Sequence, residues 1–334
     1  MKRYLLPQDG QFYKANLHAH STLSDGKLCP EEIKVCYKMM GYSVYAYTEH
    51  TNYYDLRHLD DENFITLPSY EIAFRNYTRP AFNLYEGEPL MIDHMECVHM
   101  NLFAIDPDDP KTKAIKLYDI GGQEADGIDK EHGFTADDIN EAIRRAKEAG
   151  FFVSYNHPHW SLNTAELLSK LEGIDALEII NGGSLRSSGM DFVPHVYREF
   201  AWQGKRMICV GGDDTHWVRH FARGWTMIKA PELSHKAIMK AMMDGDCYAS
   251  AGPEIKELYV EDNELHIKTS AAQAIHFATA GRSKQSKLMD EKTGEPVTEA
   301  VFKLKPEYVF FHIIVKDMRG NPATTRIYYM DELQ

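Results

Sequence analysis

Several stretches of the chain carry apolar residues at a spacing of three and four positions, and each is followed by a short apolar run. The stretches are residues 30–41, 135–150, 164–172 and 192–203. This spacing predicts amphipathic helices, and the glycines at positions 41 and 150 suit the ends of the first two. The apolar runs predict buried strands. The sequence therefore predicts four helix–strand units in succession.

The predicted strands end in side chains that bind metals or carry protons. YSVYAYTEH ends at His50, FFVSYNH ends at His157, DALEIIN contains Glu178, and MICVGG leads to Asp214 and His216. In barrels and doubly wound sheets the carboxyl ends of parallel strands gather at one edge, where sites form. We therefore predict an α/β fold, a parallel-stranded barrel or sheet with one shared site at that edge.

From Glu254 onward the apolar spacing changes from a helical period to strict alternation. Alternating runs such as LHIKTS and FFHIIVKD, separated by turn residues, predict a small antiparallel sheet or sandwich. We therefore expect two domains, one over residues 1–250 and an all-β domain over residues 254–334. Three histidines of the second domain are expected to be structural: His266, His276 and His312.

The composition fits this division and narrows the class of protein. A chain of 334 residues has room for one α/β domain of about 250 residues and a smaller one. The net charge is −13 without a basic tract, which argues against a nucleic acid or an anionic membrane as partner. No apolar run of about 18 residues occurs and the N-terminal stretch turns polar early, so a cytoplasmic location is expected. The five cysteines include no CxxC pair, whereas 16 histidines point to a metal site with nitrogen and oxygen ligands.

The strongest local feature is His18-Ala19-His20, followed by Asp25. On a strand, residues i and i+2 share a face, so both imidazoles can reach one metal ion. The chain offers more imidazole and carboxylate ligands than one ion can use, so a cluster of two or three divalent cations is expected. The further candidates are Glu49, His50, Glu71, His99, His157, His159, Asp214 and His216.

These motifs resemble those of the PHP (polymerase and histidinol phosphatase) metallohydrolases, an amidohydrolase-like group. The matching segments are NLHAHSTLSDG, YTEHT, YEI, the lone His99, NHPHW, ALEIING and GGDDTH, in the family's order across residues 16–216. The segment from FARGW to ASAGP, with the C-terminal sheet, resembles the CehA/McbA-like subgroup. The resemblance implies a distorted seven-stranded (β/α) barrel with a two- or three-metal site at its C-terminal face.

The resemblance also implies a role for each ligand. His18 and His20 would hold one metal ion and Asp25 with His50 a second, while Glu71 would bridge. His99 and His157 would hold a further ion, and Asp214 and His216 would close the site, with His216 returning to the ion of the first pair. The chain departs from the family pattern at Glu49, where aspartate is usual, and at Trp160, which follows a second histidine.

Other polar residues have more than one reading. His159 is a further ligand, a general acid for the leaving group, or a surface residue. Glu49 and Glu178 are expected to orient metal-bound imidazoles through the free ring N–H, or to be structural. Arg223 is the best candidate for clamping an anion, and a salt bridge is its alternative. Arg186 and Arg57 are weaker candidates for the same role.

The main hypothesis is a metal-dependent hydrolase, most simply a phosphoesterase in which a hydroxide that bridges metal ions attacks small phosphate esters. Metal ions polarise a carbonyl as readily as a phosphoryl oxygen, so a carbamate, ester or amide hydrolase is the alternative. A metal-stabilised binding module without catalysis is the third. Imidazole and carboxylate ligands suit manganese, zinc and iron alike. The expected partner is a small-molecule substrate, with no nucleic acid and no membrane.

Overall fold

The computed structural model describes residues 2–75, 96–113, 134–189, 192–282 and 285–333. Its helices are α1 (Pro30–Met39), α2 (Pro110–Lys113), α3 (Ala136–Glu148), α4 (Ala165–Lys170), α5 (Gly182–Ser188), α6 (Pro194–Trp202) and α7 (His235–Asp244). Short 3-10 helices are η1 (Arg57–Leu59), η2 (Val218–His220), η3 (Pro306–Tyr308) and η4 (Met330–Leu333). In this part of the chain every helix is too short or too polar to cross a membrane.

The strands up to the middle of the chain are β1 (Arg3–Tyr4), β2 (Gln11–Asn16), β3 (Val44–Ala46), β4 (Ile65–Leu67), β5 (Ser69–Arg75), β6 (Cys97–Ala104), β7 (Phe151–Asn156), β8 (Ala176–Asn181) and β9 (Ile208–Gly212). The later strands are β10 (Trp225–Ala230), β11 (Cys247–Ser250), β12 (Ile255–Glu261), β13 (Glu264–Thr279), β14 (Ser286–Leu288), β15 (Val297–Lys303), β16 (Phe310–Asp317), β17 (Pro322–Thr325) and β18 (Tyr328–Tyr329).

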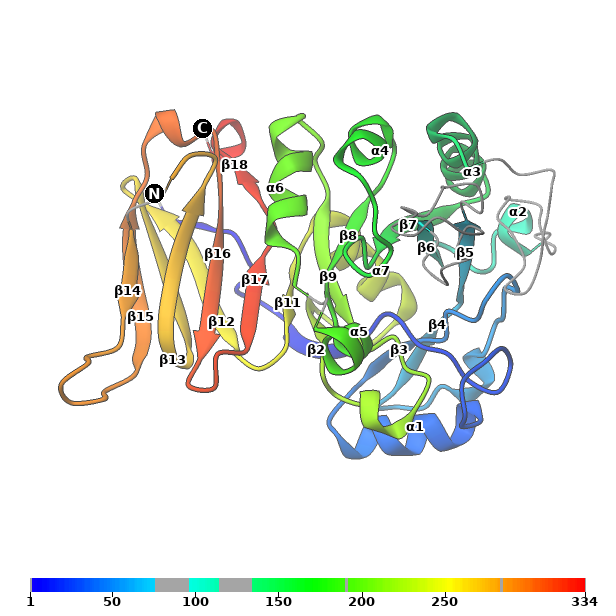
Figure 1. Cartoon of the computed structure of the whole chain (residues 1–334). Helices are drawn as coiled ribbons and strands as arrows, with labels where there is room; N and C mark the ends of the chain where they lie inside the picture. Colours follow the sequence, from blue (N-terminus) through cyan, green and yellow to red (C-terminus); the bar gives the residue numbers. More distant parts are fainter. Residues whose placement is uncertain (1, 76–95, 114–133, 190–191, 283–284, 334) are drawn as a thin grey trace, which may run out of the picture.

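The described residues form a mixed α/β structure with two sheets, of 13 and five strands (Figure 1). The large sheet has the order β1-β12-β13-β16-β17-β11-β10-β2-β3-β4, with β14 and β15 paired to β13 and β18 to β16. The small sheet has the order β5-β6-β7-β8-β9. The α/β class is as predicted, while closure into a seven-stranded barrel stays a prediction.

The four predicted helices are confirmed as α1, α3, α4 and α6. In α3, Thr135 caps the first turn, because its hydroxyl accepts from the amide of Asp138 at 3.2 Å. The apolar stripes of α3, α4 and α6 pack into one core with the five-stranded sheet, and α7 packs against the strands β2, β3 and β10. Figure 1 shows α3, α4 and α6 in a row along the same side of the molecule, with α1 on the other. The helices thus hold the strands in place and leave the strand ends for the site.

The prediction of uniformly parallel strands is wrong for β6 and β10. The runs β2-β3-β4 and β7-β8-β9 are parallel, but β6 is antiparallel to both of its neighbours and β10 is antiparallel to β2. Parallel neighbours need a long crossover, usually a helix, and none of the four helix–strand units ends at β6. The chain turns back after β9 through η2, so β10 runs away from the end that β9 reaches.

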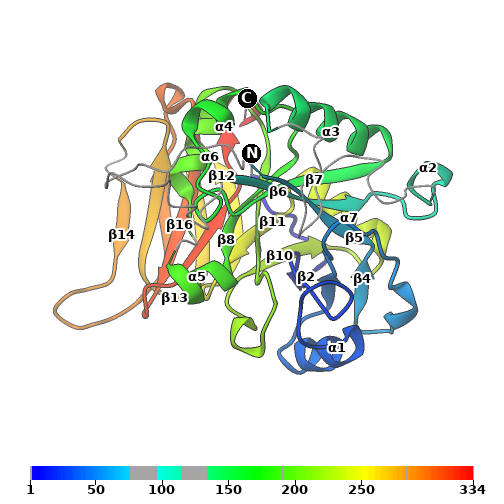
Figure 2. The same cartoon turned by 45° about the vertical axis from the view of Figure 1, so that its right-hand side comes forward.

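The C-terminal strands β12 to β18 pair antiparallel throughout, as the alternating pattern predicts. They form no separate sheet, because β17 pairs with β11, β11 with β10, and β10 with β2. Figure 2 shows the C-terminal strands beside the helices and strands of the α/β part. The domain boundary between residues 250 and 254 stays a prediction.

Candidate metal centre

Backbone pairing continues past the strand ends and fixes where the candidate ligands lie. The amide of Asp214, after β9, donates to the carbonyl of His18, after β2, at 2.8 Å. A parallel bridge likewise joins His50, after β3, to Glu71 in β5. Residues that are far apart in the sequence therefore meet at one edge, as the repeated helix–strand pattern predicts.

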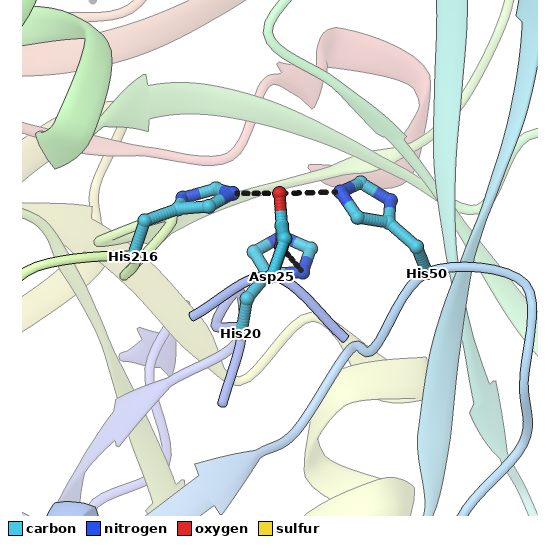
Figure 3. A group of neighbouring side chains, drawn as sticks. All are labelled: His20, Asp25, His50 and His216. Carbon is cyan, nitrogen blue, oxygen red and sulfur yellow. Dashed lines mark ion pairs between the residues drawn. The ribbon is translucent and has the colours of Figure 1, made fainter. Parts of the chain in front are cut away.

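One group of side chains gathers around Asp25 (Figure 3). Its Oδ2 lies 3.2 Å from Nε2 of His216 and 3.7 Å from Nε2 of His50, which approach from opposite sides. Its Oδ1 lies 3.7 Å from Nδ1 of His20. Each of the four residues offers a ligand atom within 4.8 Å of the others, a spacing that a single metal ion can bridge.

Two further groups adjoin the first and share residues with each other. One contains His18, Glu71 and His157, and the other contains His18, His20 and Asp214. Oδ1 of Asp214 lies 3.3 Å from Nε2 of His20 and 3.5 Å from Nε2 of His18. Shared side chains make the three groups one continuous cluster rather than three separate sites. His20 groups here with Asp25 as well as with His18, unlike the division of ligands that the family resemblance implies.

Glu71 stands at the centre of the arrangement. Its side chain is buried, and both carboxylate oxygens face imidazole nitrogens. The nearest nitrogen lies at 3.3 Å for His18, 3.5 Å for His20, 3.1 Å for His50, 3.0 Å for His99 and 3.6 Å for His157. His99 contacts Glu71, and its ring centroid lies 4.9 Å from that of His157, but it belongs to none of the three groups among the described residues.

Several of these buried atoms have no hydrogen-bond partner in the described part of the chain. They are Nε2 of His18, Nδ1 and Nε2 of His20, and Oε2 of Glu71. A buried polar atom without a partner is costly, so a group of them facing one space needs an explanation. Divalent cations supply it, because imidazole nitrogens and carboxylate oxygens are their ligands. The residues present therefore fit a metal centre.

The pKa shifts within the cluster also indicate that its surroundings favour positive charge. Burial alone would lower the pKa of His50 and His99, but acidic neighbours outweigh it. Asp25 and Glu71 raise the pKa of His50 to about 9, and Glu71 with Cys97 raises that of His99 to about 10. The imidazoles hold the pKa of Glu71 and Asp214 well below the usual range despite their burial. His20 is the exception, because burial and the charge of His50 lower its pKa to about 3.

Neighbouring groups orient several of the candidate ligands. Oε1 of Glu178 lies 2.9 Å from Nδ1 of His18, and its other oxygen accepts from Asn181 at 2.9 Å. The hydroxyl of Ser161 lies 2.9 Å from Nδ1 of His157. With Nδ1 engaged, Nε2 of each imidazole points toward the shared carboxylates. Hydrogen bonds of this kind fix the tautomer and the orientation of metal-bound histidines.

Glu49 does something different from Glu178. It accepts hydrogen bonds from the amide of Ser21 at 2.9 Å and from the hydroxyls of Ser21 and Ser24, both at 2.5 Å. These bonds hold the turn that carries Asp25 and reach no imidazole among the described residues. Glu49 therefore positions a candidate ligand through the backbone rather than through a ring nitrogen.

Backbone strain collects at the same edge. His157 has a φ of 24°, Asp214 a φ of 48° and Thr51, which follows His50, a φ of 67°. Non-glycine residues adopt positive φ only at a cost, and such residues concentrate at functional sites.

The structure does not bring every candidate to the centre. His159 is exposed and belongs to none of the three groups in the described part of the chain. Arg57 pairs with Asp55 and Asp108, so it is no free anion clamp. Arg186 is exposed on α5, and Arg223 lines a separate cleft.

Sequence reasoning missed two buried residues beside the centre. Asp213 accepts hydrogen bonds from Tyr37 and from the amides of residues 222–224. Nδ1 of His220 lies 3.3 Å from the carbonyl of Asp214. The doubled aspartate of GGDDTH was a signal for the first, whereas His220 had no motif of its own.

Comparisons with protein-family models and with curated proteins find no match. Among solved structures, a two-domain protein from Bacteroides vulgatus that contains a predicted PHP-like metal-dependent phosphoesterase is similar at 15% identity and a TM-score of 0.45, over 98% of this chain and 90% of that one. An amidohydrolase from Chromobacterium violaceum is similar at 16% identity and a TM-score of 0.39, over 60% and 87%. The lesion-specific endonuclease PfuEndoQ from Pyrococcus furiosus is similar at 14% identity and a TM-score of 0.42, over 87% and 69%. At these levels of similarity we draw no conclusion about activity from the likeness.

Proposed function

We propose that the protein is a metal-dependent hydrolase, and specifically a phosphoesterase for small phosphate esters. One observation carries the proposal, the set of buried imidazole and carboxylate atoms without hydrogen-bond partners that face one another at the strand ends. A purely structural cluster would satisfy these atoms internally, as Asp213 does a short distance away.

The ligand set suits two or three ions of manganese, zinc or iron. Bound there, such ions would polarise a substrate oxygen and lower the pKa of water. The chain's own contribution is geometric. Glu71 lies between the histidines of neighbouring groups, Glu178 and Ser161 fix two of the rings, and Glu49 holds the turn of Asp25.

The substrate class is the less constrained part of the proposal. The same centre would serve a carbamate, ester or amide, and those substrates form the second arm of the test. The charge of −13 argues against a nucleic acid substrate. We therefore expect no turnover of DNA or RNA by the metal-loaded protein.

The test is release of inorganic phosphate from a panel of nucleotide and sugar phosphates by manganese-loaded protein. We expect release by the parent protein and its loss in His157→Ala, since His157 offers a ligand atom beside Glu71. The matched control is His195→Ala, which removes an exposed histidine on α6 and should keep the parent activity.

Activity that survives in His157→Ala would show a contaminant or a different site. Silence on phosphates with turnover of a carbamate, ester or amide would replace the phosphoesterase with the alternative hydrolase. Silence on both panels, with metal bound, would favour the non-catalytic module.

A further inference from the structure

A cleft of about 430 Å³ lies between the α/β part and the C-terminal strands. Its walls come from α5 and the 222–225 segment on one side and from the turn between β16 and β17 on the other. Arg223 lines the first wall and Arg319 the second. Two arginines from distant parts of the sequence therefore line one cleft.

Both arginines lack an acidic partner among the residues that the structure describes. In the described part of the chain, no carboxylate forms an ion pair with the side chain of Arg223 or Arg319, and both are exposed. In contrast, Arg57, Arg206 and Arg326 all pair with acids. Since the chain has a net charge of −13, two unpaired cations in one cleft make a local attraction for anions.

The carboxylate that lines the cleft is already engaged. Oδ1 of Asp317 accepts from the amides of Arg319 at 2.8 Å and Asn321 at 2.9 Å, and its Oδ2 accepts from the side-chain amide of Asn321 at 2.9 Å. These bonds shape the turn that carries Arg319. Asp317 thus fixes the backbone of the turn at Arg319 instead of forming an ion pair with its side chain.

On the other wall, hydrogen bonds also fix the backbone at Arg223. Its amide donates to Oδ1 of the buried Asp213 at 2.7 Å, and the amide of Ala222 donates to Oδ2 at 2.7 Å. Ala222 has a φ of 55°, a conformation that a side chain disfavours. A strained residue held by a buried carboxylate fixes the direction in which the next residue leaves the backbone.

The cleft opens at the same end of the molecule as the metal centre. Thr226 of β10 pairs with Ala15 of β2, shortly before His18, and β11 and β17 continue this register with Ser250 opposite Ala323. The segments that carry Arg223 and Arg319, just before β10 and β17, therefore lie level with the strand ends that carry the ligands.

Gly182 lies between Arg223 of the cleft and Asn181, which contacts the candidate metal centre. A Cβ at this position would lie 2.7 Å from Cβ of Arg223 and 2.7 Å from Oδ1 of Asp213. The preceding residue, Asn181, donates to Oδ2 of Asp214 at 3.2 Å. The wall of the cleft is therefore one residue removed from a partner of the metal centre.

We propose that Arg223 and Arg319 bind a second phosphate group of the substrate while its scissile phosphate occupies the metal centre. The proposal rests on the phosphoesterase function proposed above. Guanidinium groups bind phosphate through paired N–H donors, and two of them on opposite walls would select substrates with two anionic groups. The C-terminal strands then take part in substrate selection, since they supply Arg319.

The test compares a sugar bisphosphate with the corresponding monophosphate, using full-length, metal-loaded protein. In Arg223→Met/Arg319→Met we expect the ratio of kcat/KM for the bisphosphate over the monophosphate to fall about tenfold, mainly through KM, because charge-assisted hydrogen bonds are lost. Arg282→Met removes an exposed arginine that lies outside the cleft lining, and should keep the parent ratio.

A second readout is independent of turnover. Calorimetry with inorganic pyrophosphate should show binding to the parent and to His157→Ala, weakened about tenfold in the double arginine variant. Equal binding by parent and double variant would overturn the site. Lost binding with an unchanged kinetic ratio would overturn the assignment to substrate and indicate a site for free phosphate. If the parent hydrolyses neither substrate, the proposed function fails, whereas the pyrophosphate result still decides the anion site.

Discussion

Histidines are buried in two regions of the molecule, and the two regions treat them in opposite ways. At the candidate metal centre, the carboxylate of Glu71, with the thiol of Cys97, outweighs burial and raises the pKa of His99 to about 10. Among the C-terminal strands, burial and the nearby charge of Arg198 lower the pKa of His312 to about 3, and its Nδ1 lies 3.0 Å from the hydroxyl of Thr324. Both histidines are buried, so the difference between their pKa values comes from the acidic groups beside His99.

This contrast distinguishes a histidine that only packs in the core from one whose surroundings favour a bound cation. A neutral imidazole beside a hydroxyl, such as His312, has no charged group beside it to offset, although its Nε2 has no hydrogen-bond partner among the described residues. A ring against a buried carboxylate needs positive charge, either protons or a metal ion, to offset the desolvation of the carboxylate. The position of acidic side chains therefore says more about function than the number of histidines.

The largest effect is expected when the central carboxylate, that of Glu71, is removed. In Glu71→Gln we expect loss of bound metal and a fall in activity of more than about 100-fold, since even outer partners of a metal site are worth about 10- to 100-fold. Metal content by mass spectrometry and phosphate release are the measurements. Glu172→Gln, an exposed glutamate, is the control. Full metal content in Glu71→Gln would contradict the central role of this residue.

A smaller effect is expected from the carboxylate behind the ring of His18. Glu178→Gln keeps the shape of the side chain and removes the charge that faces Nδ1 at 2.9 Å. Metal affinity should fall about 10- to 100-fold, because the ring loses the partner that orients it and raises its basicity. A chelator competition titration measures this. Unchanged affinity would leave Glu178 a structural residue.

The smallest effect concerns the other region and acts on stability. Because the pKa of His312 is lowered to about 3 in the folded protein, the unfolded chain takes up the proton first as the pH falls below 6.5. Folding then loses up to about 1.4 kcal/mol per pH unit from this residue. In His312→Gln the free energy of unfolding, measured with urea at pH 7, 6 and 5, should fall less steeply than in the parent. Parallel curves for the two proteins would show that His312 does not titrate on unfolding.

Much of the fold was readable from the sequence because its signals are local. Helix periodicity located α1, α3, α4 and α6, and alternation located the C-terminal strands. The candidate ligands also gather where the strand ends predicted, although their roles await a test. The direction of β6 was not readable, since it depends on what lies beside the strand rather than on its own pattern.

The surroundings of some candidate residues depend on long-range packing, and their roles stay predictions. Arg223 looked like part of the centre because it follows His216 closely in sequence. The buried carboxylate of Asp213 instead turns the backbone there, and Arg223 faces the cleft beside the C-terminal strands. Glu49 likewise faces serines rather than a ring. Only the folded chain decides which neighbour a polar side chain meets.

The sheet that runs from β2 through β10, β11 and β17 into the C-terminal strands has a consequence for how the protein can be cut. Removing the residues after β11 would leave the side of β11 that pairs with β17 without its partner. An uncovered strand edge recruits other chains, so a shortened protein would tend to aggregate. The C-terminal strands thus protect the β11 edge of the α/β part.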